Sequence, residues 1–228
     1  RNVNLKILLF NNRIYGLTKG QYSPTSEVGK VTKSTPMGSL DAPFNPVSLA
    51  LGAEASFVAR TIDSDRKHLT EVLRAAAEHP GTALVEIYQN CNIFNDGAFD
   101  ALKDRQQAEE ALIRLEHGQP IRFGADGARG VVRDRRTGDL EVVTVTPENE
   151  AELLVHDAGA ASPTTAFALS RLADPDTLHH TPIGVFRSVE RPVYDEQMTE
   201  QLDTAIEQKG KGDLGALLAG GDTWTVVG

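Results

Sequence analysis

The sequence has 228 residues, of which 40% are hydrophobic and 24% charged, a composition typical of a globular chain. Its formal net charge of −9, with no basic cluster interleaved with aromatic residues, disfavours nucleic-acid binding. No apolar run approaches the roughly eighteen residues of a membrane span, and the single cysteine, Cys91, excludes an internal disulfide and favours a reducing cytoplasm.

The first predicted element is a strand over residues 3–10. Its nearly continuous apolar run, which includes Leu5, Ile7 and Phe10, predicts a parallel strand covered on both faces. The loop that follows, residues 11–25, leaves the carboxyl end of this strand. In α/β folds such loops form ligand sites. The start of the chain is therefore the first candidate for a functional site.

The loop contains residue types suited to a metal and an anion. Asn12 offers an amide oxygen for a hard cation such as Mg²⁺. Gly16 and Gly20 allow close approach of the backbone to a ligand, and Lys19 can hold an anion. An ordinary polar turn is the alternative interpretation, because Asn and Gly are common in turns.

The elements that follow alternate between helices and strands. Asn45 and Pro46 are typical of an N-cap and a first helical residue. Strand, helix and strand over residues 56–88 indicate a βαβ unit with parallel strands. Further helices are predicted after a cap at Asp63 or Ser64, over 106–117 and 163–172, from a lead-in over 190–195 to residue 208, and after Asp213. Strands are predicted over 56–60, 82–88, 121–123, 130–133 and 140–145, and a strand or extended segment over 182–187.

Cys91 follows the strand over residues 82–88. This strand and the first one are expected in the same sheet, with their carboxyl ends at the same edge, so Cys91 is predicted near the Asn12 loop. A lone cysteine is also common as a small buried hydrophobic residue, and that interpretation stays open here.

Residues 11–25 closely resemble the thiamine-diphosphate loop of 2-oxoacid:ferredoxin oxidoreductase β subunits. The similarity continues through the segment 34–38 to the C-terminus. The Gly-Asp-Gly motif that precedes the loop in that family is absent, and the Gly-Ala-Asp-Gly of residues 124–127 follows the loop instead. We therefore expect the carboxyl-terminal part of a longer subunit. The resemblance implies a parallel-sheet, thiamine-diphosphate-binding α/β fold over residues 1–104, with a smaller α+β extension over 105–228 that packs on the core and on a partner subunit.

The resemblance also implies roles for individual residues. Asn12 would be a side-chain ligand of Mg²⁺, and Ile14 a ligand through its carbonyl. Lys19 and Leu17 would lie beside the reacting carbon, with Lys19 near the substrate carboxylate. Cys91 would supply one thiolate of a [4Fe-4S] cluster, whose other three cysteines are not in this chain. The remaining residues implied to bind the cofactor are Tyr15, Gly16 and Thr18.

The implied activity is oxidative decarboxylation of a 2-oxoacid to acyl-CoA and CO₂, with electrons passed through the cluster to ferredoxin. The implied partners are an α subunit, the rest of the β subunit, ferredoxin and coenzyme A. The sequence looks most like 2-oxoglutarate enzymes, with pyruvate-type enzymes as an alternative. A non-catalytic interaction or electron-transfer module and a thiamine-dependent decarboxylase without a cluster are the other hypotheses. The aromatic ending, residues 223–226, is expected to dock on another surface.

Overall fold

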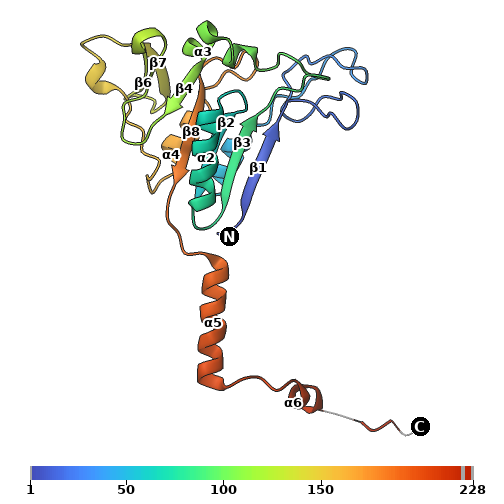
Figure 1. Cartoon of the computed structure of the whole chain (residues 1–228). Helices are drawn as coiled ribbons and strands as arrows, with labels where there is room; N and C mark the ends of the chain where they lie inside the picture. Colours follow the sequence, from blue (N-terminus) through green and yellow to red (C-terminus); the bar gives the residue numbers. More distant parts are fainter. Residues whose placement is uncertain (1, 222–223, 227–228) are drawn as a thin grey trace.

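The computed structural model describes residues 2–221 and 224–226. Its main sheet has five strands in the order β1–β3–β2–β8–β4. Strands β1 (Lys6–Asn11), β2 (Phe57–Ile62) and β3 (Ala83–Tyr88) are parallel, whereas β8 (Thr181–Ser188) is antiparallel to β2 and parallel to β4 (Leu112–Leu115). The carboxyl ends of β1, β3 and β2 therefore lie at one edge of the sheet (Figure 1). This is the α/β fold that the sequence predicts.

Helices cover both faces of this sheet. Along β2, Phe57 and Ala59 pack against α2 (Arg66–Glu78), while Val58 faces the cluster that contains α1 (Pro46–Gly52) and α4 (Thr164–Ser170). The alternation follows from the two-residue period of a strand. Asn45 caps α1 as predicted, since its side chain accepts a hydrogen bond from the Ser48 N–H at 3.0 Å. The cap of α2 is Asp65, so the predicted cap at Asp63 or Ser64 is wrong by one or two residues.

The prediction that the first strand is covered on both faces is wrong for the described chain. β1 is an edge strand that pairs only with β3. Apolar side chains along it are exposed, and Phe10 reaches 60% exposure. The apolar run does form a parallel strand, but its composition alone does not indicate whether other parts of the protein cover it.

The prediction of one helix over residues 106–117 is also wrong. Helix α3 (Arg105–Ala111) ends early, and the chain continues directly into β4. Leu112, Ile113 and Leu115 are buried at the end of the sheet, where β4 pairs with β8. The helical spacing of these leucines is therefore outweighed by pairing with a strand that is distant in sequence. The described residues also form three short 3₁₀ turns, η1 (Asp100–Leu102), η2 (Ala125–Gly127) and η3 (Glu150–Glu152).

A second, three-stranded sheet lies beyond β4. It is antiparallel and consists of β5 (Arg122–Phe123), β6 (Arg129–Arg133) and β7 (Leu140–Thr144). These strands and the hairpin turn between β6 and β7 agree with the prediction. The Gly-Ala-Asp-Gly segment forms the η2 turn between β5 and β6. The boundary at residue 104 stays a prediction, and β4 and β8 from beyond it complete the main sheet.

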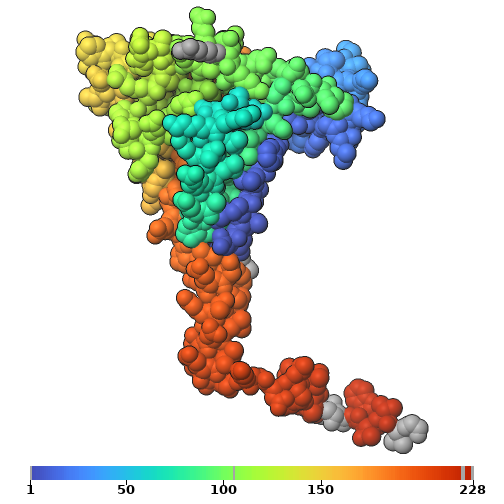
Figure 2. Space-filling model, viewed as in Figure 1, coloured from blue at the N-terminus to red at the C-terminus, as the bar shows by residue number. Residues whose placement is uncertain are grey.

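The C-terminal helices project away from the body of the molecule. Helix α5 (Tyr194–Lys209) buries none of its residues and leads to α6 (Leu214–Ala219), which Asp213 caps as predicted (Figures 1 and 2). Trp224 and Val226 are exposed, while Thr223 lies outside the described residues, so docking of this ending stays a prediction. No helix among the described residues is long and apolar enough to cross a membrane.

Gly184 permits the close approach of β8 and β4. Its φ is +118°, and a Cβ atom at this position would lie 2.8 Å from the Leu115 carbonyl oxygen. We expect Gly184→Ala to destabilise the fold by about 1–3 kcal/mol, because both the backbone conformation and the space oppose a side chain. Differential scanning calorimetry measures the effect as a lower Tm, by about 2–4 °C per kcal/mol for a chain of this size.

Gly52→Ala is the matched control for this substitution. Gly52 ends α1, and nothing lies within 4 Å of the added Cβ. Its Tm should stay the same or rise slightly, because alanine favours the helix. Equal melting temperatures for the two variants would show that β4 and β8 can move apart to accommodate the Cβ atom without loss of stability.

Candidate functional site

Two loops leave the edge of the main sheet that is formed by the carboxyl ends of β1, β3 and β2, here called the site edge. One follows β1 and the other, residues 89–97, follows β3. Asn11 pairs with Tyr88 in the sheet, and the Gln89 N–H donates to the Asn11 carbonyl at 3.1 Å. The structure therefore places Asn12 and Cys91 just beyond the ends of adjacent strands, as the order of the predicted elements indicates.

The segment Asn11–Ile14 makes two successive side-chain turns. The Asn11 Oδ1 accepts from the Arg13 N–H at 3.1 Å, and the Asn12 Oδ1 accepts from the Ile14 N–H at 3.2 Å. Such turns are a known property of Asn side chains. Between them Arg13 adopts a φ of +56°, a conformation that costs a non-glycine residue about 1–3 kcal/mol. This strain persists only because surrounding contacts hold the turn.

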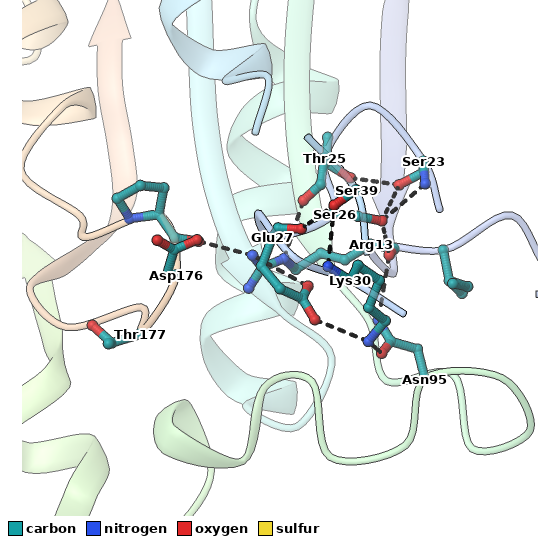
Figure 3. Close-up of polar contacts among 12 residues, drawn as sticks. Arg13, Ser23, Thr25, Ser26, Glu27, Lys30, Ser39, Asn95, Asp176 and Thr177 are labelled. Atoms are coloured by element: carbon teal, nitrogen blue, oxygen red, sulfur yellow. Dashed lines mark hydrogen bonds and ion pairs between the residues drawn. The ribbon is translucent and has the colours of Figure 1, made fainter. Parts of the chain in front are cut away.

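Arg13 provides most of those contacts. Its guanidinium is 5% exposed and donates to the Thr25 carbonyl at 3.1 Å and to the Pro175 carbonyl at 2.8 Å, with the Glu27 carboxylate 3.5 Å away (Figure 3). The Arg13 carbonyl in turn accepts from the Ser26 hydroxyl at 2.6 Å. Arg13 thus holds in place its two neighbours in sequence, Asn12 and Ile14, which are the predicted metal ligands.

The next residues form a tight, exposed turn. The Tyr15 N–H donates to the Gln21 carbonyl at 2.8 Å, and the Gly20 N–H donates back to the Tyr15 carbonyl at 3.0 Å. Leu17, at 98% exposure, and Lys19 both project from this turn into solvent. The Thr18 hydroxyl closes the turn by donating to the Tyr15 carbonyl at 3.3 Å. An apolar and a cationic side chain therefore extend from the same exposed turn.

Asn95 links the two loops. It is 6% exposed, and its Nδ2 donates to the Asn12 carbonyl at 2.9 Å. Its Oδ1 accepts a hydrogen bond from Lys30, which also forms an ion pair with Glu27 at 3.0 Å (Figure 3). Burial raises the pKa of Glu27, but a backbone hydrogen bond, Lys30 and Arg13 together outweigh burial and leave this pKa below its ordinary value. Glu27 is therefore a carboxylate at neutral pH.

A buried polar chain lies beneath the loops. Glu86 accepts from the Arg60 Nε at 2.6 Å and from the Asn11 Nδ2 at 2.8 Å. It forms part of the lining of a cavity of about 210 Å³, together with Arg13 and Tyr88. Burial is the main cause that raises the pKa of Tyr88 to about 12, so this phenol stays protonated. Arg60 and Glu86 are charged residues within two otherwise apolar strands. That pattern was a sequence signal for this buried hydrogen-bonded group, and our prediction missed it.

The oxygen atoms of the loop after β1 can provide part of the coordination shell of Mg²⁺. The Asn12 amide oxygen uses one lone pair for the Ile14 N–H and keeps another for a ligand. Among the described residues there is no group of three or more His, Cys, Asp or Glu side chains arranged for a metal ion. Other ligands of a six-coordinate Mg²⁺ must therefore come from a bound diphosphate, water or residues outside this set.

The chain does not by itself fit a [4Fe-4S] cluster. Cys91 is half-buried and is the only cysteine in the sequence, whereas such a cluster is usually held by four thiolates. A cluster would therefore need thiolates from outside this chain. Arg13, Ser26 and Asn95 were not predicted as site residues, because their role depends on contacts that the sequence does not reveal.

Comparisons with known proteins agree with this geometry. Residues 1–87 match the family described as thiamine pyrophosphate enzyme, C-terminal TPP binding domain. The 2-oxoglutarate oxidoreductase subunit KorB of Mycobacterium tuberculosis is 60% identical over 228 residues, which cover 99% of this chain and 60% of that protein. The 2-oxoacid:ferredoxin oxidoreductase subunit beta of Saccharolobus solfataricus is 44% identical over 158 residues, or 66% of this chain and 50% of that protein.

A solved structure shares the fold. It is the 2-oxoglutarate:ferredoxin oxidoreductase from Magnetococcus marinus with 2-oxoglutarate, coenzyme A and succinyl-CoA bound, and it matches with a TM-score of 0.63 and 24% identity. The match covers 96% of this chain and 58% of that one. The chain thus spans about 60% of the length of the Mycobacterium relative. By these relationships, it belongs to the β-subunit family of 2-oxoacid:ferredoxin oxidoreductases.

Proposed function

We propose that this chain is the carboxyl-terminal part of the β subunit of a 2-oxoglutarate:ferredoxin oxidoreductase. The enzyme would oxidatively decarboxylate 2-oxoglutarate to succinyl-CoA and CO₂ and pass the electrons through an iron–sulfur cluster to ferredoxin. The observation that carries this proposal is the 60% identity to a 2-oxoglutarate oxidoreductase subunit along 99% of the chain. That relative and the 2-oxoglutarate synthase subunit of Archaeoglobus fulgidus are both named for 2-oxoglutarate, which supports 2-oxoglutarate over pyruvate as the substrate.

The loop after β1 would hold the cofactor. The Asn12 side chain and the Ile14 carbonyl would coordinate Mg²⁺, which anchors the diphosphate. Tyr15, Gly16 and Thr18 would contact thiamine diphosphate through the tight turn that they form. When bound, this cofactor supplies the electron sink that decarboxylation of a 2-oxoacid requires.

The exposed end of the same turn would meet the substrate. Leu17 would provide an apolar wall beside the reacting carbon. Lys19 would bind the substrate carboxylate, because burying that charge without a partner is costly. The Lys19 ammonium is exposed and makes no ion pair with any residue that the structure describes, so it is available for this role.

The proposal requires other chains and segments. Three further thiolates for the cluster would come from outside this chain, and Cys91 would supply the fourth. An α subunit would complete the thiamine site, as the naming of the relatives as subunits suggests. Coenzyme A would accept the acyl group and ferredoxin the electrons. We place the enzyme in the cytoplasm, where a lone thiol stays reduced.

Asn12→Ala should abolish Mg²⁺-dependent binding of thiamine diphosphate in the assembled enzyme, because the metal loses an oxygen ligand. Titration of the apo-enzyme with thiamine diphosphate at fixed Mg²⁺ measures this binding. Asn12→Asp is the control, since it keeps both the oxygen and the bond to the Ile14 N–H, and it should retain binding. Unchanged affinity in Asn12→Ala would eliminate the metal role.

Lys19→Met should raise the apparent KM for 2-oxoglutarate by about tenfold or more, the scale of one lost charge-assisted hydrogen bond. Some loss of kcat should follow, because the carboxylate is no longer oriented. Steady-state kinetics at fixed ferredoxin and coenzyme A test this. Lys33→Met, at an exposed lysine of the same long loop, is the control. Identical parameters for Lys19→Met and the wild type would mean that Lys19 does not touch the substrate.

Cys91→Ala should remove or destabilise the iron–sulfur cluster while the fold stays intact. The reason is the loss of one of four thiolate ligands. Iron content and visible absorbance of the assembled enzyme measure the cluster, and far-ultraviolet circular dichroism measures the fold. A variant with full iron content would show that Cys91 is only a packing residue.

A further inference from the structure

The cavity of about 210 Å³ beneath the loop after β1, here called the Tyr88 cavity, is lined by none of the residues proposed to bind thiamine diphosphate or the substrate. Arg60 of β2 and Glu86 and Tyr88 of β3 line it from the sheet. Residues 42–46 and the segment after α4, residues 171–178, contribute the rest of the lining together with the loop that contains Arg13. A space of this size can hold several water molecules or a small organic molecule.

The Tyr88 hydroxyl is a buried polar group without a partner in the described part of the chain. Tyr88 is 7% exposed, and its ring stacks on Phe99 with the ring centroids 4.7 Å apart. Its hydroxyl makes no hydrogen bond with any described residue, yet protein atoms do not fully enclose it, so it faces the cavity. Because burial keeps this phenol protonated, the hydroxyl is a donor that lacks an acceptor. Such a group is costly to bury unless something in the cavity accepts its hydrogen bond.

The other unoccupied groups of the Tyr88 cavity are donors as well. The Arg171 guanidinium is exposed and makes no hydrogen bond or ion pair with the residues that the structure describes. Arg13 donates through its Nε and Nη2 atoms, which leaves Nη1 without an acceptor among the same residues. By contrast, both carboxylate oxygens of Glu86 already accept, one from Asn11 and one from Arg60. The missing partner is therefore an acceptor.

The charge of the lining indicates which kind of acceptor fits. The lining contains three arginines and two carboxylates, Glu86 and Asp174, which leaves one positive charge in excess. Glu27 approaches Arg13 from outside the lining, but it is also paired with Lys30. A planar carboxylate carries a single negative charge and can accept two parallel hydrogen bonds from a guanidinium. A phosphate dianion would bring a second charge close to the two carboxylates of the lining, which repel it.

We propose that the Tyr88 cavity is a binding site for a small carboxylate anion, which accepts hydrogen bonds from the Tyr88 hydroxyl and the Arg171 guanidinium. The site goes beyond the proposed function, because binding there requires neither Mg²⁺ nor thiamine diphosphate nor a second chain. The bound anion lies next to Arg13, the residue that holds Asn12 and Ile14 in place.

Isothermal titration of the full 228-residue chain with succinate tests the site, at neutral pH and constant ionic strength and without Mg²⁺ or thiamine diphosphate. We expect saturable binding of one succinate per chain. Tyr88→Phe should raise the Kd about tenfold, the scale of one lost hydrogen bond to a charged group. Arg171→Gln should raise it by at least as much, because it removes both the charge and the bidentate contact. Phosphate should bind more weakly than succinate.

Two matched controls make the same chemical changes outside the Tyr88 cavity. Tyr22→Phe removes a hydroxyl that donates to Asp41 at 3.0 Å, and Arg136→Gln removes an exposed guanidinium in the turn between β6 and β7. Both variants should bind succinate with the Kd of the wild type. Thermal unfolding without succinate adds an independent measurement. The Tm of Tyr88→Phe should equal or exceed that of the wild type, since the hydroxyl that is lost has no partner in the described chain.

Several results would overturn the proposal. Absence of saturable binding, or wild-type affinity in Tyr88→Phe, would mean that the Tyr88 cavity holds only water. Tighter binding of phosphate than of succinate would exclude a carboxylate site. A lower Tm in Tyr88→Phe would show that the hydroxyl is bonded within the protein. The effect of Asn12→Ala on cofactor binding is measured separately, so the carboxylate site and the proposed function can each fail alone.

Discussion

The buried ion pair between Arg60 and Glu86 is the contact on which the site edge depends. Both side chains are almost fully buried, and removing one partner of such a pair costs about 3–5 kcal/mol because the other charge is left uncompensated. Asn11 completes the group by donating to Glu86. Since β1, β2 and β3 each contribute one of these three residues, the pair fixes how the ends of the three strands lie relative to one another.

Asn11 transmits this constraint to the loop. Its Oδ1 accepts from the Thr25 hydroxyl and from the Arg13 N–H. Asn11 therefore both donates to Glu86 and begins the strained turn. Arg13 then reaches the Pro175 carbonyl, 162 residues away in sequence. The geometry of Asn12 and Ile14 is therefore determined before any ligand binds, which would lower the cost of ordering them around the proposed metal.

The site combines this rigid part with an exposed one. Asn12 and Ile14 are held by buried contacts, whereas Leu17 and Lys19 project from a turn whose own hydrogen bonds are local. This division suits the proposed roles, in which a cofactor needs fixed ligands and a substrate needs a surface that it can reach. Apolar side chains along β1 are exposed, and among the described strands β1 pairs with β3 alone, so the described chain presents the site at the end of an edge strand.

The sequence by itself determined what short-range chemistry controls. Asn45 and Asp213 cap their helices because an Asn or Asp oxygen satisfies free N–H groups, and the order of elements placed Asn12 and Cys91 at one edge. The helix over 106–117 and the covered first strand were wrong, because strand pairing and coverage depend on distant partners. Arg13 and Asn95 became recognisable only in the folded chain, since the contact of Asn95 with Asn12 spans 83 residues and no local pattern encodes it.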